Sequence, residues 1–106
     1  MSELPLTIKI LTPEGELVSA RCESVTLYAR DNEKGEGGGS FGILKGHLPL
    51  IAALEEGSPA IAKAGGREVL RATVRGGFAY SADDIITVIA TGAELEGSSL
   101  DEKETQ

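Results

Sequence analysis

The sequence predicts an all-β protein, an antiparallel β-sandwich or a flattened barrel of eight or more short strands. Apolar and polar residues alternate with a period of two in run after run, which is the pattern of a strand with one buried face. Turn sequences containing glycine or proline separate these runs. Apolar residues at helical spacing are scarce, so we expect at most one short helical turn.

The alternation is clear from the start of the chain. Leu6, Ile8 and Ile10 alternate with polar residues, and Thr12-Pro13-Glu14-Gly15 then forms a sequence typical of a type I turn. Because short turns join consecutive runs, we expect neighbouring strands to be antiparallel. The strands expected in this half cover residues 6–10, 18–22, 25–29, 41–44 and 50–54.

The second half of the chain repeats this pattern with one difference. Gly65-Gly66 can supply the positive φ angles of a tight hairpin turn, and Asp83-Asp84 is also typical of a turn. The residues after Asp84 are almost continuously apolar, which predicts a central strand. The strands expected in this half cover residues 59–64, 70–74 and 85–90.

Acidic residues gather at the C-terminal end. The chain of 106 residues has 10 basic and 17 acidic side chains and a formal net charge of −7. Beyond Ala93, five acidic residues stand against a single lysine, and almost nothing is apolar. We therefore expect one folded domain over residues 1–93 and an acidic, polar, disordered tail over residues 94–106.

The composition excludes several function classes. An acidic chain with two Phe, two Tyr and no Trp lacks both the positive charge and the stacking surface that nucleic acid binding uses. One Cys and one His cannot form a zinc site, and we assign no metal. No apolar run approaches the roughly 18 residues of a membrane span, so we expect no direct membrane insertion.

Residues that could support catalysis are few. Any nucleophilic mechanism would depend on His47, the one histidine. Cys22 lies on the inward face of an expected strand, where a free cysteine is usually a small core residue. Asp83 and Asp84 would point to opposite faces of a strand and are better explained as a turn. We therefore assign no catalytic residue and expect a protein that is not an enzyme.

A glycine-rich segment, Gly35-Glu36-Gly37-Gly38-Gly39-Ser40, resembles a phosphate-binding loop only superficially. It lacks the Gly-Lys-Ser/Thr ending of a P-loop, and no βαβ unit surrounds it. We interpret the residues from Asp31 to Gly39 as a flexible connection and expect no bound cofactor.

The stretch from Ser40 to Leu54, SFGILKGHLPLIAAL, resembles the most recognisable segment of the epsilon subunit of F-type ATP synthases. That segment usually reads Gly-x-Phe/Leu-Gly-Ile-x-Pro-Gly-His-x-Pro-Leu. Three other segments follow the family's order, namely ILTPEG at 10–15, RGGFA at 75–79 and IITVIA at 85–90. The resemblance covers residues 6–93 and implies a ten-stranded β-sandwich that joins the central stalk of the rotary motor.

The resemblance also implies partners and contact residues. It places Thr12, His47 and Ala52 on the side facing the gamma subunit, and Ser40 and Gly42 on the loop facing the c ring. In the same motif, Gly42 and Gly46 are expected to allow tight bends on either side of a short strand. The function implied is that of a non-catalytic subunit that couples gamma to the c ring, peripheral to the cytoplasmic face of the bacterial plasma membrane.

Family members commonly continue into a helical hairpin that restrains ATP hydrolysis and in some members binds ATP. The residues after Ala93 are too few and too polar for such a hairpin, so we expect this domain to bind no nucleotide. The sequence leaves open whether the protein naturally lacks the hairpin. Two other functions are alternatives: a stand-alone β-sandwich that binds a small ligand or sugar, and an enzyme that uses His47.

Overall fold

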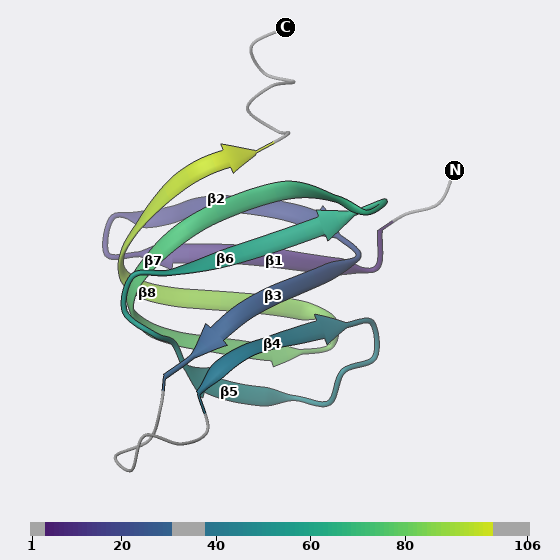
Figure 1. The fold of residues 1–106 in the computed structure, drawn as a ribbon, viewed down its shortest axis with the longest axis horizontal. Coiled ribbons are helices and arrows are strands. Elements are labelled where there is room, and N and C mark those ends of the chain that lie inside the picture. The colour runs from purple at the N-terminus through teal and green to yellow at the C-terminus, as the bar shows by residue number, and fades with distance from the viewer. Residues whose placement is uncertain (1–3, 31–37, 99–106) are drawn as a thin grey trace, which may run out of the picture.

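Two long strands determine how the sheet of this protein folds. In the computed structural model, which describes residues 4–30 and 38–98, β7 (Arg67–Ala82) and β8 (Ile85–Ser98) pair antiparallel and curve strongly along their length (Figure 1). The other strands are β1 (Leu6–Thr12), β2 (Gly15–Cys22), β3 (Ser24–Ala29), β4 (Gly39–Leu44), β5 (Leu50–Ala53) and β6 (Ser58–Ala64).

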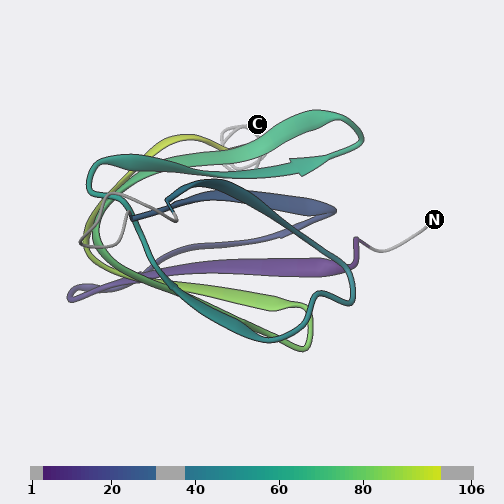
Figure 2. The same cartoon turned by 60° about the horizontal axis from the view of Figure 1, so that its bottom comes forward.

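Because β7 and β8 curve, one continuous sheet forms two layers. The first, here called the β1 layer, has the order β2-β1-β8-β7-β5 and uses the first half of β8 and the second half of β7. The second, here called the β3 layer, has the order β4-β3-β6-β7-β8 and uses the other halves. Figure 2 shows β1 and the first half of β8 below β6 and the first half of β7.

This arrangement confirms the predicted all-β sandwich. The described residues form eight strands, but β7 and β8 each contribute to both layers, which makes ten strand segments. The pairs are antiparallel, as expected, except that β1 and β8 run parallel. A parallel pair is possible here because β1 and β8 are far apart in the sequence and no hairpin joins them.

The core lies between the two layers. Leu6, Ile8 and Ile10 of β1 are fully buried, as their alternation predicts, and they pack with Val25 and Leu27 of β3. Inward-facing residues of β7 and β8 belong to the same cluster, namely Leu70, Ala72, Val74, Ala79, Ile86, Val88 and Ala90.

The prediction for β7 was too short because two glycines look like a strand break. The strand continues from Leu70 through Gly76 and Gly77 to Ala82, and both glycines have positive φ angles, 55° and 129°. At Gly77, a β-carbon would collide with the backbone carbonyl oxygen of Ile89 on β8. Only glycine allows this close approach of the two backbones, so the pair marks a bend within a strand.

The strand β8 extends through Ser98, beyond Ala93 where the domain was expected to end. Ala93 and Leu95 pair with Val74 and Ala72 of β7, and Leu95 is half-buried against the core. The predicted boundary between residues 93 and 94 therefore falls inside this strand. Residues 99–106 of the expected tail, and residues 31–37 of the expected flexible connection, lie outside the described part of the chain.

Candidate interaction surface

The outer side of the β1 layer carries apolar side chains that the core does not use. In β8, Ile86 and Val88 point inward and are fully buried, whereas Ile85 and Ile89 point outward. Successive side chains of a strand alternate between its two faces, so a continuous apolar run supplies both. The prediction of a central strand is confirmed, and its outward residues are exposed.

The neighbouring strands extend this apolar surface. Phe78 of β7 pairs with Ile89, and Tyr80 pairs with Ile51 of β5. Paired residues point to the same side of a sheet, so these side chains are neighbours. Ile51 is 70% exposed, Phe78 56% and Ile89 53%. We call the set Ile51, Phe78, Tyr80, Ile85 and Ile89 the apolar face.

A shallow apolar hollow adjoins one end of the apolar face. Its volume is about 410 Å³. It lies where the β1–β2 turn approaches the bend of β7, and it is lined by Thr12, Pro13, Gly77, Phe78, Ile89, Ala90 and Thr91. An apolar side chain of another molecule could enter it while the apolar face is covered.

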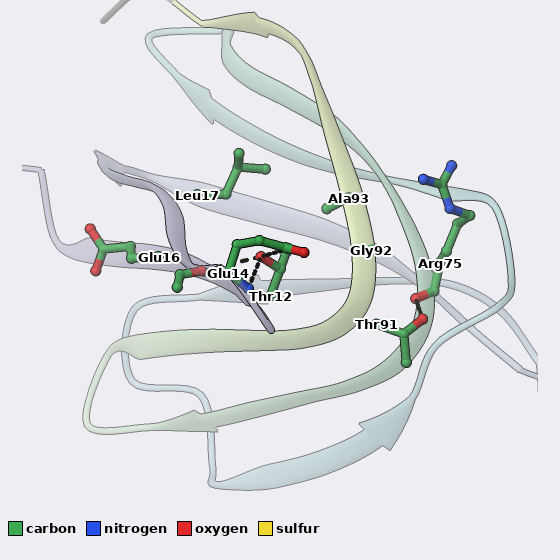
Figure 3. A pocket seen from close by; sticks show the side chains of 9 residues that line it. Thr12, Glu14, Glu16, Leu17, Arg75, Thr91, Gly92 and Ala93 are labelled. Atoms are coloured by element: carbon green, nitrogen blue, oxygen red, sulfur yellow. Dashed lines mark hydrogen bonds between the residues drawn. The ribbon is translucent and has the colours of Figure 1, made fainter.

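A second hollow, of about 360 Å³, is polar and lies behind the same turn. It is lined in part by Glu16, Arg75 and Thr91 (Figure 3). The charged ends of Glu16 and Arg75 point away from each other in Figure 3. The third charged residue of the hollow, Glu14, accepts a hydrogen bond from the Thr12 hydroxyl at 3.1 Å. The charged ends of Glu16 and Arg75 therefore do not converge on one point, as they would in a site for a charged ligand.

The opposite end of the β1 layer is covered by the loop between β4 and β5. This crossover loop, residues 45–49, runs from the edge of the β3 layer to the edge of the β1 layer. His47 lies in it, exposed to solvent, with its Nδ1 atom 2.7 Å from the carbonyl oxygen of Leu48. The Gly46 N–H donates to Asp84 Oδ1, in the β7–β8 turn, at 2.8 Å.

The three residues that the sequence assigned to gamma lie on the β1 layer or at its end, but they do not form one cluster. Thr12 ends β1 beside the apolar hollow, and its hydroxyl oxygen accepts a hydrogen bond from the Glu14 N–H at 3.3 Å. His47 lies at the other end of the layer. Ala52 pairs with the buried Ala79, so its side chain lies on the inner side of the sheet, while its neighbour Ile51 points outward.

The two residues assigned to the c ring lie on the other layer. Ser40 and Gly42 belong to the edge strand β4, where they are exposed and pair with Tyr28 and Thr26. The expectation of a bend at Gly42 was wrong, because the residue lies inside β4 and continues its pairing with β3. Gly46, with φ of 80°, does occupy a turn.

Cys22 has the structural role expected of it. Its side chain is fully buried, and burial raises the pKa of its thiol to about 11, an effect that the positive charge of Arg21 only partly opposes. A buried thiol that stays protonated is a poor nucleophile. Asp83 and Asp84 form the two-residue turn between β7 and β8, as expected.

Two further features bear on possible functions. Within residues 4–30 and 38–98, no three His, Cys, Asp or Glu side chains come close enough together to hold a metal ion. The same residues contain no helix of the length and apolar character that crossing a membrane requires.

Sequence reasoning missed the apolar face and the contact between Asp84 and Gly46. The signal for the first was present, since residues 85–90 are apolar at both inward and outward positions. The second had no signal, because Asp84 and Gly46 are 38 residues apart in the chain. Only the fold brings the β7–β8 turn to the crossover loop.

Comparisons with known proteins agree on one family. The model of the family described as "ATP synthase, Delta/Epsilon chain, beta-sandwich domain" matches residues 5–96. An ATP synthase epsilon chain of Frankia casuarinae is 33% identical over 92 residues, which are 87% of this chain and 99% of that one. Its counterpart in Bacillus velezensis is 35% identical over 91 residues, which are 86% of this chain but only 62% of that one.

Solved structures share the fold. A chain in the mitochondrial ATP synthase of Euglena gracilis, in a structure of its OSCP/F1/c-ring assembly, superposes with a TM-score of 0.65 at 17% identity. The match covers 99% of this chain and 62% of that one. A chain in the central stalk/c-ring structure of the Tetrahymena thermophila mitochondrial enzyme gives a TM-score of 0.59 at 15% identity, over 88% and 68% of the two chains.

Proposed function

Because the chain belongs to the family of ATP synthase delta and epsilon chains, through their β-sandwich domain, we propose that it is a non-catalytic subunit of the central stalk of an F-type ATP synthase. In this role it joins the gamma subunit to the c ring while the complex makes or hydrolyses ATP. Family membership favours this function over a stand-alone module for a small ligand or sugar.

The observation that carries the proposal is the apolar face. A chain with 10 basic and 17 acidic side chains has enough charged residues to cover a solvent-facing sheet, yet this sheet exposes Phe78, Tyr80 and three isoleucines instead. Large contiguous apolar patches on soluble domains mark surfaces that another protein covers. We infer that gamma covers the apolar face and fills the adjoining hollow.

With gamma on the apolar face, the residues that contact each partner can be proposed. Thr12 lies at one end of the apolar face and His47 at the other, so a partner that spans the face reaches both. We propose these two residues and Ala52 as the gamma side, with Ala52 acting through the packing of β5 because its side chain faces inward. Ser40 and Gly42, exposed on β4 of the other layer, are proposed as the side toward the c ring.

The location proposed for the protein is the cytoplasmic face of a bacterial plasma membrane, where it is held by the membrane-associated complex. Support comes from the curated relatives, which are bacterial ATP synthase epsilon chains.

The affinity of the chain for purified gamma tests the proposal. We expect Phe78→Ser and Ile89→Ser each to raise the dissociation constant at least about tenfold, since buried aromatic and aliphatic anchors dominate interfaces of this kind. The matched control is Leu44→Ser, which replaces a 62% exposed leucine on β4, outside the apolar face. Equal effects of the three substitutions, or none, would contradict the proposed orientation.

A further inference from the structure

The turn between β7 and β8 has an unusual backbone. It consists of Asp83 and Asp84, whose φ angles are 54° and 64°. Two-residue hairpin turns of this type favour glycine, asparagine and aspartate, and among these only glycine adopts positive φ without strain on a β-carbon. Aspartate tolerates the conformation less well than glycine does, so the two side chains invite a functional explanation.

The two aspartates differ in what they contact. Asp84 is half-buried and touches two other segments: its carboxylate oxygen Oδ1 accepts a hydrogen bond from the Gly46 N–H at 2.8 Å, and its carbonyl oxygen accepts one from the Thr7 N–H at 3.0 Å. Asp83 is exposed to solvent. The strained turn thus holds one carboxylate against the crossover loop.

The contact with Asp84 differs from the other hydrogen bonds of the crossover loop. Its other hydrogen bonds, among the described residues, are local: the His47 N–H donates to the Leu44 carbonyl at 3.0 Å, and the His47 ring contacts the Leu48 carbonyl. Within residues 4–30 and 38–98, the bond from Gly46 to Asp84 is the one that ties the loop to a distant segment. It ties the loop that carries the exposed His47 and the 78% exposed Leu48 to Asp84, the residue directly before Ile85 of the apolar face.

We propose that Asp84 is a positioning residue for partner binding, which fixes the crossover loop in the arrangement that gamma recognises. The inference rests on the proposed function, since it concerns the same surface. A loop that is ordered before binding loses less conformational freedom when the partner arrives. The carboxylate thus raises affinity without itself touching the partner.

If Asp84 only positions the crossover loop, loss of its carboxylate should weaken gamma binding but leave the stability of the domain nearly unchanged. Glycine substitutions can test this. Asp84→Gly removes the carboxylate but also relieves the positive φ, so the two effects on stability oppose each other and the melting temperature should stay within about 3 °C. The crossover loop, however, loses its distant contact. Asp83→Gly is the matched control, because it relieves strain in the same turn and leaves the Asp84 carboxylate in place.

The experiment measures two quantities on the full chain: hydrogen exchange of the Gly46 amide by NMR, and affinity for purified gamma by calorimetry. For Asp84→Gly we expect exchange of that amide to become about tenfold faster and the dissociation constant to rise about five- to tenfold, as loss of one hydrogen bond predicts. Asp83→Gly should match the unmodified chain in both. Asp84→Asn should keep the exchange rate and the dissociation constant near those of the unmodified chain, since its amide oxygen can accept the same hydrogen bond from Gly46.

Unchanged affinity of Asp84→Gly, or an equal loss in Asp83→Gly, would overturn the inference. Failure of the unmodified chain to bind gamma at all would overturn the proposed function as well. The exchange rate of the Gly46 amide separates the two cases, because it reports on the contact with Asp84 in the free protein. Fast exchange in the unmodified chain contradicts the positioning role whatever gamma does.

Discussion

At the scale of single residues, Cys22 shows how position decides chemistry. The same thiol would be reactive on the surface, but here it belongs to the core and its pKa is raised to about 11. We expect its reaction with a soluble disulfide reagent at pH 8 to be at least about 100-fold slower in the folded protein than in denaturant. Comparable rates in the two states would show that Cys22 is accessible and contradict its place in the core.

The raised pKa of Cys22 also predicts a pH dependence of stability. The folded state holds the thiol proton more tightly than the unfolded state, whose thiol has an ordinary pKa near 9.0. The stabilisation is therefore complete below pH 9 and is lost as the pH rises toward 11. Urea titrations of the protein and of Cys22→Ala should show a steeper loss of unfolding free energy over this window when the cysteine is present.

Residue roles were predictable where they depend on local pattern. The inward position of Cys22 and the turn at Asp83-Asp84 follow from alternation and turn chemistry. The contact of Asp84 with Gly46 was not predictable, because it depends on how β4, β7 and β8 are arranged in three dimensions.

At the scale of elements, the bend of β7 links the two layers. Gly77 has φ of 129°, and a β-carbon there meets the backbone of β8. We expect Gly77→Ala to lower the unfolding free energy by more than about 2 kcal/mol, because backbone atoms cannot move aside as a flexible side chain can. The measurement is chemical denaturation.

The control for this substitution is Gly57, which also has positive φ, 72°, but where an added β-carbon would meet no atom within 4 Å. Gly57→Ala should cost about 1 kcal/mol, the strain of the left-handed backbone alone. Equal costs at the two positions would show that the close approach of β7 and β8 is not what requires Gly77.

Strand positions were largely predictable and strand lengths were not. Alternation, a continuous apolar run at 85–90 and the turn signals between shorter pieces together located a segment of each of the eight strands. The second half of β7 was missed because Gly76-Gly77 interrupts the pattern, and its place in both layers depends on pairing with β8. Local sequence does not encode that pairing.

At the scale of the whole molecule, the sandwich separates two kinds of surface. The β1 layer presents the apolar face, whereas the outer side of the β3 layer carries the ion pair between Arg71 and Glu68, at 2.8 Å. One side is thus suited to contact with a protein through apolar burial, and the other to polar contacts, among them those proposed for Ser40 and Gly42 with the c ring. The sandwich was predictable from composition and alternation, but which face remains apolar became clear only from the register.

A regulatory role for the sandwich itself would require that it bind ATP. We expect ATP at millimolar concentration to give no binding heat with this chain in calorimetry, since its polar hollow has diverging charges and its glycine-rich segment lacks P-loop chemistry. Micromolar binding of ATP would contradict this and assign a regulatory site to the sandwich.

A stalk subunit that binds gamma should be found with gamma in native membranes, and this holds for the chain if the proposed function is right. Affinity purification of the tagged chain from native membranes, followed by mass spectrometry of the recovered proteins, tests it most directly. We expect gamma and the c subunit to be recovered with the unmodified chain, and gamma recovery to fall sharply when Phe78 and Ile89 are both changed to serine. Recovery of a folded chain without gamma, from membranes that contain an intact ATP synthase, would contradict it.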